Sequence, residues 1–174
     1  MTYVICVVGR GRRSGKTSLI EGLTKALTED GFVVATVKNI HCSFDTPEKD
    51  TWKHLEAGAS VTVATTPTNL IVIKKINNPT IDDVLKHIHN NHDILFVEGF
   101  KKSLYPKILC TNDFSDAKNM MKESSNIIMV SGNITNKKNE IEQFKQKFPE
   151  IQVYTLKEIT QVLREILIKT KKQT

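Results

Sequence analysis

The chain has 174 residues, of which 39% are hydrophobic and 25% charged, and its formal net charge is +6. This balance is ordinary for a globular protein, the length suits one domain, and no apolar run approaches the roughly 20 residues that span a bilayer. The N-terminus enters a strand-like segment without the pattern of a secretory signal, and the three scattered cysteines form no CxxC pair. We therefore expect one domain over residues 1–174, located in the cytoplasm and without a membrane partner.

The positive charge is unevenly distributed. Much of the excess lies in the C-terminal tail and in a loop near the N-terminus: Lys169, Lys171, Lys172, Arg10, Arg12 and Arg13. No nucleic-acid recognition motif accompanies these charges, so we do not expect nucleic acid as a partner. The arginines of the loop are instead placed to face a phosphate, whereas the tail is a solvated basic segment.

Short apolar runs alternate with amphipathic helical patterns along the chain. In chain order we predict a strand at 3–8, a helix at 16–30, a strand at 32–37, a polar loop at 38–50, a helix at 51–57, strands at 60–65 and 70–76, a helix at 80–90, strands at 94–97 and 126–130, a helix containing Ile141, Phe144 and Phe148, a strand at 152–156, and a last helix containing Ile159 and Leu167. This alternation is typical of an α/β protein whose mostly parallel sheet has helices on both faces.

The segment after the first predicted strand has the composition of a phosphate-binding loop. It runs through Gly11, Arg12, Arg13 and Ser14 to Gly15, Lys16, Thr17 and Ser18 at the start of a helix. In such a loop, backbone N–H groups converge on the β-phosphate of a nucleotide, and the helix start adds its own unpaired N–H groups. Lys16 would reach the β- and γ-phosphates, and the Thr17 hydroxyl would ligate Mg²⁺. We therefore predict, more specifically, a three-layer P-loop NTPase fold.

The loop departs from the usual Gly-x-x-x-x-Gly-Lys-Ser/Thr spacing. Arg10 stands where the first glycine is expected, and Gly9 and Gly11 flank it. Either the loop carries one extra residue or its turn is shifted. A basic surface turn that merely contains Gly-Lys-Thr is disfavoured, because the strand, turn, helix and hydroxyl all agree.

A second nucleotide-site element is expected at the end of a neighbouring buried strand. Glu98 closes the strand predicted at 94–97 and precedes Gly99. Open α/β sheets bind ligands outside the carboxyl ends of their strands, so Glu98 is a candidate to hold Mg²⁺ or to orient an attacking water. The alternative is an ordinary acidic residue that ends a strand.

Five polar side chains follow the second predicted strand: Lys38, His41, Asp45, Lys49 and Asp50. This loop begins at the same edge of the sheet as the phosphate loop, so its side chains can approach the γ-phosphate and the metal. The carboxylates are candidate partners of Mg²⁺ or water, and the lysines are candidate phosphate counter-charges. A solvated loop is the alternative from composition alone.

Together these motifs resemble the molybdopterin-guanine dinucleotide biosynthesis protein B family (MobB). Members of that family carry a strand, a Gly-Lys-Thr P-loop and a helix, then Lys-x-x-His, Asp-x-Pro-x-Lys-Asp, Ala-Gly-Ala and a strand ending in Val-Glu-Gly-Phe-Lys. This chain has counterparts in the same order at residues 38–41, 45–50, 57–59 and 97–101, followed by Pro-Lys-Ile at 106–108. It departs from the family at Glu48, where glycine is frequent, and its Asn136 to Asn139 segment only half resembles the Asn-Lys-x-Asp guanine motif.

The resemblance implies a GTP-binding accessory protein of molybdenum-cofactor assembly, with GTP and Mg²⁺ as its cofactors and weak GTP hydrolysis. It implies a homodimer that assists a guanylyltransferase in attaching GMP to molybdopterin, with molybdopterin-binding enzymes as further candidate partners. The candidate catalytic residues are Glu98 and Asp45, and the candidate Mg²⁺ ligands are Thr17, Glu98 and Asp45. The candidate nucleotide-binding residues are Gly11, Arg12, Arg13, Ser14, Gly15, Lys16, Thr17, Ser18, Lys38, His41, Lys49 and Asp50.

Two other function classes stay open. A small-molecule kinase or ATP-dependent ligase would need an acceptor pocket and a helical lid that carries arginines. Outside the first loop the sequence has only Arg164, which belongs to the last predicted helix. A metallochaperone GTPase would need a His/Cys cluster at ligand spacing, and no such pattern is present in the sequence.

Overall fold

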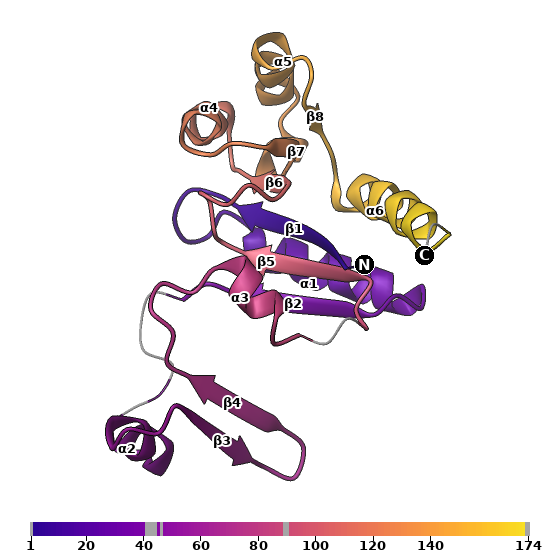
Figure 1. The fold of residues 1–174 in the computed structure, drawn as a ribbon. Coiled ribbons are helices and arrows are strands. Elements are labelled where there is room, and N and C mark those ends of the chain that lie inside the picture. Colours follow the sequence, from indigo (N-terminus) through magenta and orange to yellow (C-terminus); the bar gives the residue numbers. More distant parts are fainter. Residues whose placement is uncertain (1, 41–44, 46, 89–90, 173–174) are drawn as a thin grey trace. The chain divides into compact units, whose positions relative to one another are not determined.

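The computed structural model describes residues 2–40, 45, 47–88 and 91–172 (Figure 1). The chain forms two compact units, of which the first contains Met1–Asn39 and Ile88–Thr174 and the second contains Ile40–His87. Each unit is described by itself. The assignment of residues 1–174 to a single nucleotide-binding domain stays a prediction.

The first unit is built around a six-stranded parallel sheet in the order β2-β5-β1-β6-β7-β8. Its strands are β1 (Tyr3–Val8), β2 (Val34–Lys38), β5 (Ile94–Glu98), β6 (Lys107–Cys110), β7 (Ile127–Ser131) and β8 (Gln152–Val153). The central strands β1, β5 and β6 are buried along nearly their whole length, as expected for continuous apolar runs that are covered on both faces.

Helices α1 (Lys16–Glu29) and α6 (Leu156–Lys171) pack beside each other over the sheet (Figure 1). Their buried leucines and isoleucines join apolar residues of the strands in one core cluster. Helices α4 (Phe114–Glu123) and α5 (Lys138–Lys147) connect strands that advance in the opposite direction across the sheet, so right-handed crossovers put them on the other face. A 3-10 helix, η1 (Asn133–Asn136), follows β7. None of the helices in the described ranges has the length and apolar character needed to cross a membrane.

The predicted fold class is confirmed: the first unit is an α/β P-loop NTPase-type fold with a parallel sheet and helices. The prediction missed β6 and α4, because the sequence in this region shows no clear apolar period. The strand predicted at 152–156 is too long, because Thr155 caps α6 and exchanges hydrogen bonds with Glu158. The helix predicted at 80–90 is also too long, since α3 spans Ile81–Leu85.

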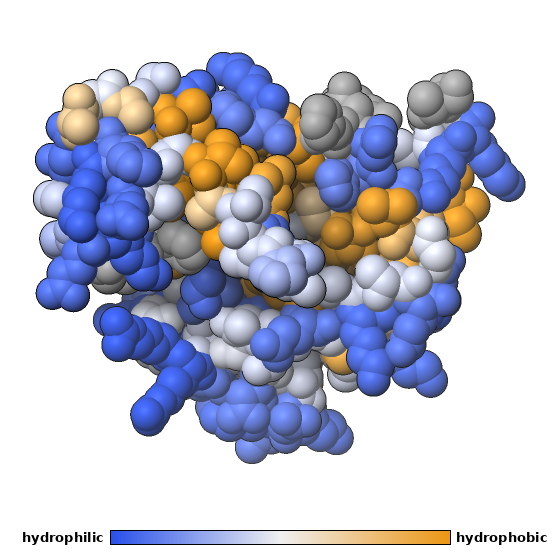
Figure 2. Space-filling view, turned by 90° about the horizontal axis from the view of Figure 1, so that it is seen from below, coloured by the Kyte–Doolittle hydropathy of each residue, from blue (hydrophilic) through white to orange (hydrophobic). Residues whose placement is uncertain are grey.

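The second unit contains α2 (Asp50–Glu56), the antiparallel hairpin of β3 (Val61–Thr65) and β4 (Leu70–Lys74), and α3. In Figure 2, hydrophobic residues reach the surface between hydrophilic ones. In the hairpin, one face carries four exposed apolar side chains: Val61, Val63, Leu70 and Val72, which are 44%, 53%, 70% and 55% exposed. A two-stranded hairpin with an open apolar face is marginally stable in water by itself.

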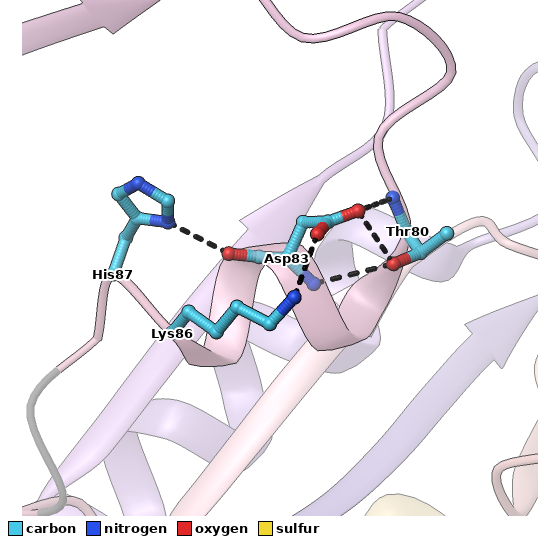
Figure 3. Close-up of polar contacts among 4 residues, drawn as sticks. All are labelled: Thr80, Asp83, Lys86 and His87. Carbon is cyan, nitrogen blue, oxygen red and sulfur yellow. Dashed lines mark hydrogen bonds and ion pairs between the residues drawn. The ribbon is translucent and has the colours of Figure 1, made fainter.

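Helix α3 begins at a capping box centred on Thr80 and Asp83 (Figure 3). The Asp83 backbone N–H donates to the Thr80 hydroxyl at 3.2 Å, and the Thr80 backbone N–H donates to the Asp83 carboxylate at 3.1 Å. The Thr80 hydroxyl also donates to this carboxylate at 2.8 Å, and Lys86 forms an ion pair with it at 3.2 Å. These donors lower the pKa of Asp83 from 3.8 to about 2, and the hydrogen bond from the Thr80 hydroxyl has the largest effect.

We predict that the start of α3 is sensitive to acid. Because the folded carboxylate has the lower pKa, its stabilising effect is complete above the unfolded value of 3.8 and is lost as the pH falls through about 2. Thr80→Val should raise the pKa of Asp83 toward 3.8, and Lys86→Met should raise it less. Titration of the Asp83 carboxyl by NMR tests this, and a wild-type midpoint near 3.8 would contradict the capping-box explanation.

Candidate functional site

The loop after β1 approaches the backbone of β6 most closely at Gly9. A Cβ atom on Gly9 would lie 2.5 Å from the carbonyl oxygen of Cys110 and 2.6 Å from the Ser14 hydroxyl. Glycine is therefore required at position 9, immediately after β1. The loop runs from Gly9 to Gly15 and is one residue longer than the usual spacing. This resolves the two options left by the sequence in favour of an extra residue, and Gly9 is a site residue that the prediction omitted.

The backbone of this loop reverses repeatedly. Gly11, Arg13 and Gly15 have φ angles of 66°, 64° and 87°, all in the left-handed region. Arg13 is unusual there, because a Cβ atom disfavours this conformation. Left-handed residues that alternate with ordinary ones turn successive N–H groups toward a common centre, which is the form of an anion-binding nest.

The N-terminus of α1 is open for an anion. Among the described side chains none caps this helix, and its first turn has no acidic residue. Its first N–H groups and the positive end of its dipole therefore face the loop without a competing carboxylate. The sequence predicted this feature through Gly15 and the residues that follow it.

Lys16 folds back across the loop. Its ammonium donates to the carbonyl oxygen of Gly11 at 2.8 Å and to the Ser14 hydroxyl at 2.9 Å. The charge is thus held by neutral acceptors at the mouth of the loop, where a phosphate oxygen would be a stronger acceptor. Arg12 and Arg13 are exposed, whereas Arg10 forms an ion pair with Asp116 of α4 at 3.3 Å.

Thr17, Lys38 and Glu98 meet where α1 begins and where β2 and β5 end. The Thr17 hydroxyl donates to a carboxylate oxygen of Glu98 at 3.0 Å, and the Lys38 ammonium lies 3.4 Å from the same oxygen. The Glu98 side chain is only 14% exposed. A hydroxyl and a carboxylate are the hard oxygen ligands that Mg²⁺ accepts while keeping several waters, so these residues fit the predicted metal.

Cys110 lies beneath the phosphate loop. Burial raises the pKa of its thiol to about 12, and the Glu98 charge adds to this effect, whereas the Lys16 charge opposes it. The thiol is therefore protonated at neutral pH. This excludes Cys110 as a nucleophile in the site.

A groove of about 490 Å³ adjoins the Thr17–Glu98 contact. It lies between α1 and β2 and is lined by Thr17, Ile20, Glu21, Thr24, Lys25, Thr36, Val37, Lys38 and Glu98. Its volume is in the range of small-molecule sites. The hydroxyl of Thr24 is buried at this groove and has no hydrogen-bond partner within the described structure.

The other predicted site residues belong to the second unit. Asp45 accepts a hydrogen bond from the Thr51 hydroxyl at 2.8 Å, and Asp50 begins α2 and pairs with Lys53 at 3.2 Å. Lys49 directly precedes α2. His41 lies outside the described residues. The roles of these residues in nucleotide or metal binding stay predictions.

The segment from Asn136 to Asn139 spans the end of η1 and the start of α5. The Asn136 amide donates to Asn133 at 3.2 Å. Its proposed similarity to a guanine-reading motif stays a prediction. In the part of the chain that the structure describes, no group of three or more His, Cys, Asp or Glu side chains is arranged to hold a metal.

We predict that Gly9→Ala disrupts the phosphate loop. The new methyl group would collide with the Cys110 carbonyl and the Ser14 hydroxyl, so the loop must shift. Overpacking of this kind costs about 1–3 kcal/mol; where this cost falls on the loop shape that binds nucleotide, affinity drops by about 5- to 150-fold. Calorimetric titration measures it. Gly31→Asn is the control, because it retains a left-handed residue after α1 with open space around it; equal affinity of both variants would contradict the prediction.

Comparison with known proteins identifies the family to which this chain is similar. Residues 4–133 match the family described as molybdopterin guanine dinucleotide synthesis protein B. A molybdopterin-guanine dinucleotide biosynthesis adapter protein of Haemophilus influenzae is 32% identical over 100 residues, which cover 55% of this chain and only 56% of that protein. A probable adapter protein of the same description from Bacillus subtilis is 29% identical over 132 residues, covering 73% of this chain and 74% of that protein.

Solved structures agree on the fold. A molybdopterin-guanine biosynthesis protein B superposes with a TM-score of 0.68 at 21% identity, covering 94% of this chain and 98% of that one. The MobB homologue of Bacillus stearothermophilus gives 0.63 at 21% identity, with 97% and 98% covered. Because the family match spans most of the chain and includes the P-loop, Lys38 and Glu98, this protein belongs to the molybdopterin guanine dinucleotide synthesis protein B family.

Proposed function

We propose that the protein binds GTP with Mg²⁺ and acts as an adapter in the formation of molybdopterin guanine dinucleotide. In this proposal it assists a molybdenum-cofactor guanylyltransferase in attaching GMP to molybdopterin, and molybdopterin-binding enzymes are further candidate partners. The observation that carries the nucleotide site is the combination of the Gly9 close approach, the folded-back Lys16 and the Thr17–Glu98 contact. The adapter role and the guanine preference rest on the family.

Each residue of the site has a distinct role in the proposal. The loop amides and the α1 N-terminus bind the phosphates, and Lys16 exchanges its two neutral acceptors for phosphate oxygens. Thr17 and Glu98 supply oxygen ligands for Mg²⁺, which offsets the negative charge of the phosphates. Lys38 pairs with Glu98 before the cation binds, and in the proposal its ammonium then serves as a counter-charge for the γ-phosphate.

Weak hydrolysis is consistent with the environment of Glu98. Its carboxylate already accepts from Thr17 and pairs with Lys38. Both contacts fall on the same carboxylate oxygen, so in this proposal Glu98 serves as a cation ligand and not as the acceptor of a water proton. We therefore propose binding and delivery of nucleotide, in the cytoplasm and without membrane or nucleic acid, over rapid turnover.

We predict that GTP binds with Mg²⁺ and that ATP binds distinctly more weakly. Lys16→Ala should reduce GTP affinity by about 10- to 100-fold, because a charge-assisted hydrogen bond to phosphate is lost. Calorimetric titrations of both nucleotides, with and without Mg²⁺, measure these differences. Lys169→Ala, an exposed lysine in the last turn of α6, is the control.

Two results would count against the proposal. Equal affinity for GTP and ATP would remove the guanine assignment while retaining the P-loop site. Unchanged GTP binding by Lys16→Ala, with circular dichroism showing a folded protein, would remove the phosphate site itself.

We also propose that the protein is a homodimer and that the open face of the β3–β4 hairpin takes part in self-association. Val63 and Val72 are cross-strand neighbours at the centre of this face, and both are more than half exposed. A second copy could cover this face with the same apolar residues, as a two-fold interface requires.

We predict that Val63→Asp weakens self-association by about tenfold or more, because a carboxylate would lose its hydration among apolar residues. Thr68→Asp introduces the same charge at the exposed turn of the hairpin and should leave the dimer intact. Sedimentation equilibrium measures both. A wild-type monomer, or equal association of both variants, would reject the interface.

The kinase or ligase alternative is favoured by one observation, the groove between α1 and β2 that opens beside Glu98. An acceptor bound there would lie next to the proposed metal ligands. However, such an enzyme needs lid arginines. Among the described residues of the first unit, Arg164 is the one arginine outside the phosphate loop, and its guanidinium pairs with Asp30. The alternative would be preferred if ATP bound more tightly than GTP.

A further inference from the structure

Lys107 is a fully buried lysine at the start of β6, with an exposed fraction of 0%. Its ammonium donates to three backbone carbonyl oxygens, those of Ser103, of Tyr105 at 3.0 Å and of Ser125 at 2.9 Å. Burial lowers the pKa of Lys107, an effect opposed by the charge of Cys6. A buried ammonium is costly unless its donors are satisfied, so these acceptors are what make this position tolerable for lysine.

Two of the three acceptors lie in the segment that connects β5 to β6. We call this segment, residues 99–106, the Glu98 loop because it directly follows Glu98. Three further side chains contact the same loop, one of them Cys6 of β1, whose Sγ lies 3.4 Å from the Ser103 hydroxyl. The Ser124 hydroxyl donates to the Lys101 carbonyl at 2.8 Å, and the Asn126 amide donates to the Leu104 carbonyl at 2.8 Å. The loop is therefore held by residues 6, 107, 124 and 126, although it contains no helix or strand.

The fixed part of the loop follows a strained turn directly behind Glu98. Gly99 and Phe100 have consecutive φ angles of 106° and 53°. Phe100 is disfavoured in this left-handed region, and such residues persist only where the surrounding structure holds them. The turn also has little space, because a Cβ on Gly99 would lie 3.1 Å from the Cβ of Asn39.

The backbone of the turn is tied to both neighbouring strands. The Gly99 N–H donates to the Val7 carbonyl at 3.1 Å, and the Glu98 carbonyl accepts from the Asn39 N–H at 3.0 Å. A change in the Gly99–Phe100 peptide therefore acts on the residue that carries the carboxylate. The Glu98 side chain must reach Thr17 from this end of β5.

We propose that Lys107 is a positioning residue for Glu98: its ammonium holds the Glu98 loop, and the loop holds the strained turn that orients the carboxylate toward Thr17. This inference rests on the proposed Mg²⁺–nucleotide function. Without the ammonium, the Ser103 and Tyr105 carbonyls lose their donor, Phe100 is released toward negative φ, and Glu98 no longer meets Thr17 in one fixed geometry. None of these contacts involves a residue of the phosphate loop.

Lys107→Met tests the proposal, because methionine is similar in length and apolar but cannot donate to the carbonyls. GTP affinity is measured by calorimetry with Mg²⁺ and without it. The variant should keep its Mg²⁺-free affinity and lose about tenfold of the gain that Mg²⁺ provides, the loss typical of supporting residues around a metal site. Hydrogen exchange should become faster in residues 99–106 but not in α1. Lys102→Met, an exposed lysine in the same loop, is the matched control and should behave as the wild type.

A chemical rescue separates positioning from general stability. Lys107→Ala should lose the same Mg²⁺-dependent gain, and ethylammonium ions should restore part of it by donating to the vacated carbonyls. Tetramethylammonium, which has no N–H donor, should not. If neither Lys107 variant folds, Ser124→Ala and Asn126→Gly loosen the same loop, and glycine keeps the left-handed backbone found at Asn126.

The outcomes are distinguishable. An unchanged Mg²⁺-dependent gain in the folded Lys107 variants, or in both loop variants, overturns the positioning role and leaves the nucleotide site intact. A proportional loss of affinity with and without Mg²⁺ overturns it too, because that pattern reports general destabilisation. If the wild type itself gains nothing from Mg²⁺, the proposed function fails first, and the inference fails with it.

Discussion

The hydrogen bond between Thr17 and Glu98 depends on a constraint of the whole sheet, namely that β1 and β5 are adjacent and parallel. Their carboxyl ends lie at the same edge, so the helix that follows β1 begins beside the carboxylate that ends β5. Strand β2 adds Lys38 from the other side of β5. Three segments separated by tens of residues therefore meet at one oxygen atom, and the chemistry proposed for the site follows from this meeting.

The phosphate loop adds a local constraint to this arrangement. Gly9 permits contact with the Cys110 carbonyl, and this contact lets β1 and β6 lie close while the loop passes over them. Within the loop, Arg10 pairs with Asp116, and Lys16 reaches back to Gly11. The additional residue lengthens the loop without removing the features that bind an anion, which are left-handed turns, an uncapped helix start and one ammonium group.

The two units differ in what stabilises them. In the first unit, buried strands and the apolar sides of α1 and α6 form a continuous core. The second unit has a short helix, a hairpin with one open apolar face and a capping box at Thr80.

The sequence alone determined the local features: the strand–glycine–helix pattern of the P-loop, the helical periods of α1 and α6, and the family motifs that include Lys38 and Glu98. These depend on neighbours within a few residues, so periodicity and motif spacing predicted them. Tertiary structure decided the rest. Only the structure identifies Gly9, and not position 10 or 11, as the first glycine of the phosphate loop. The reason is that the Cys110 carbonyl, distant in sequence, leaves no space for a side chain at position 9. The tertiary structure also placed Lys107 in the interior, which sequence rules assign to solvent, because its acceptors come from residues 103, 105 and 125, brought around its ammonium only when the parallel strands pair.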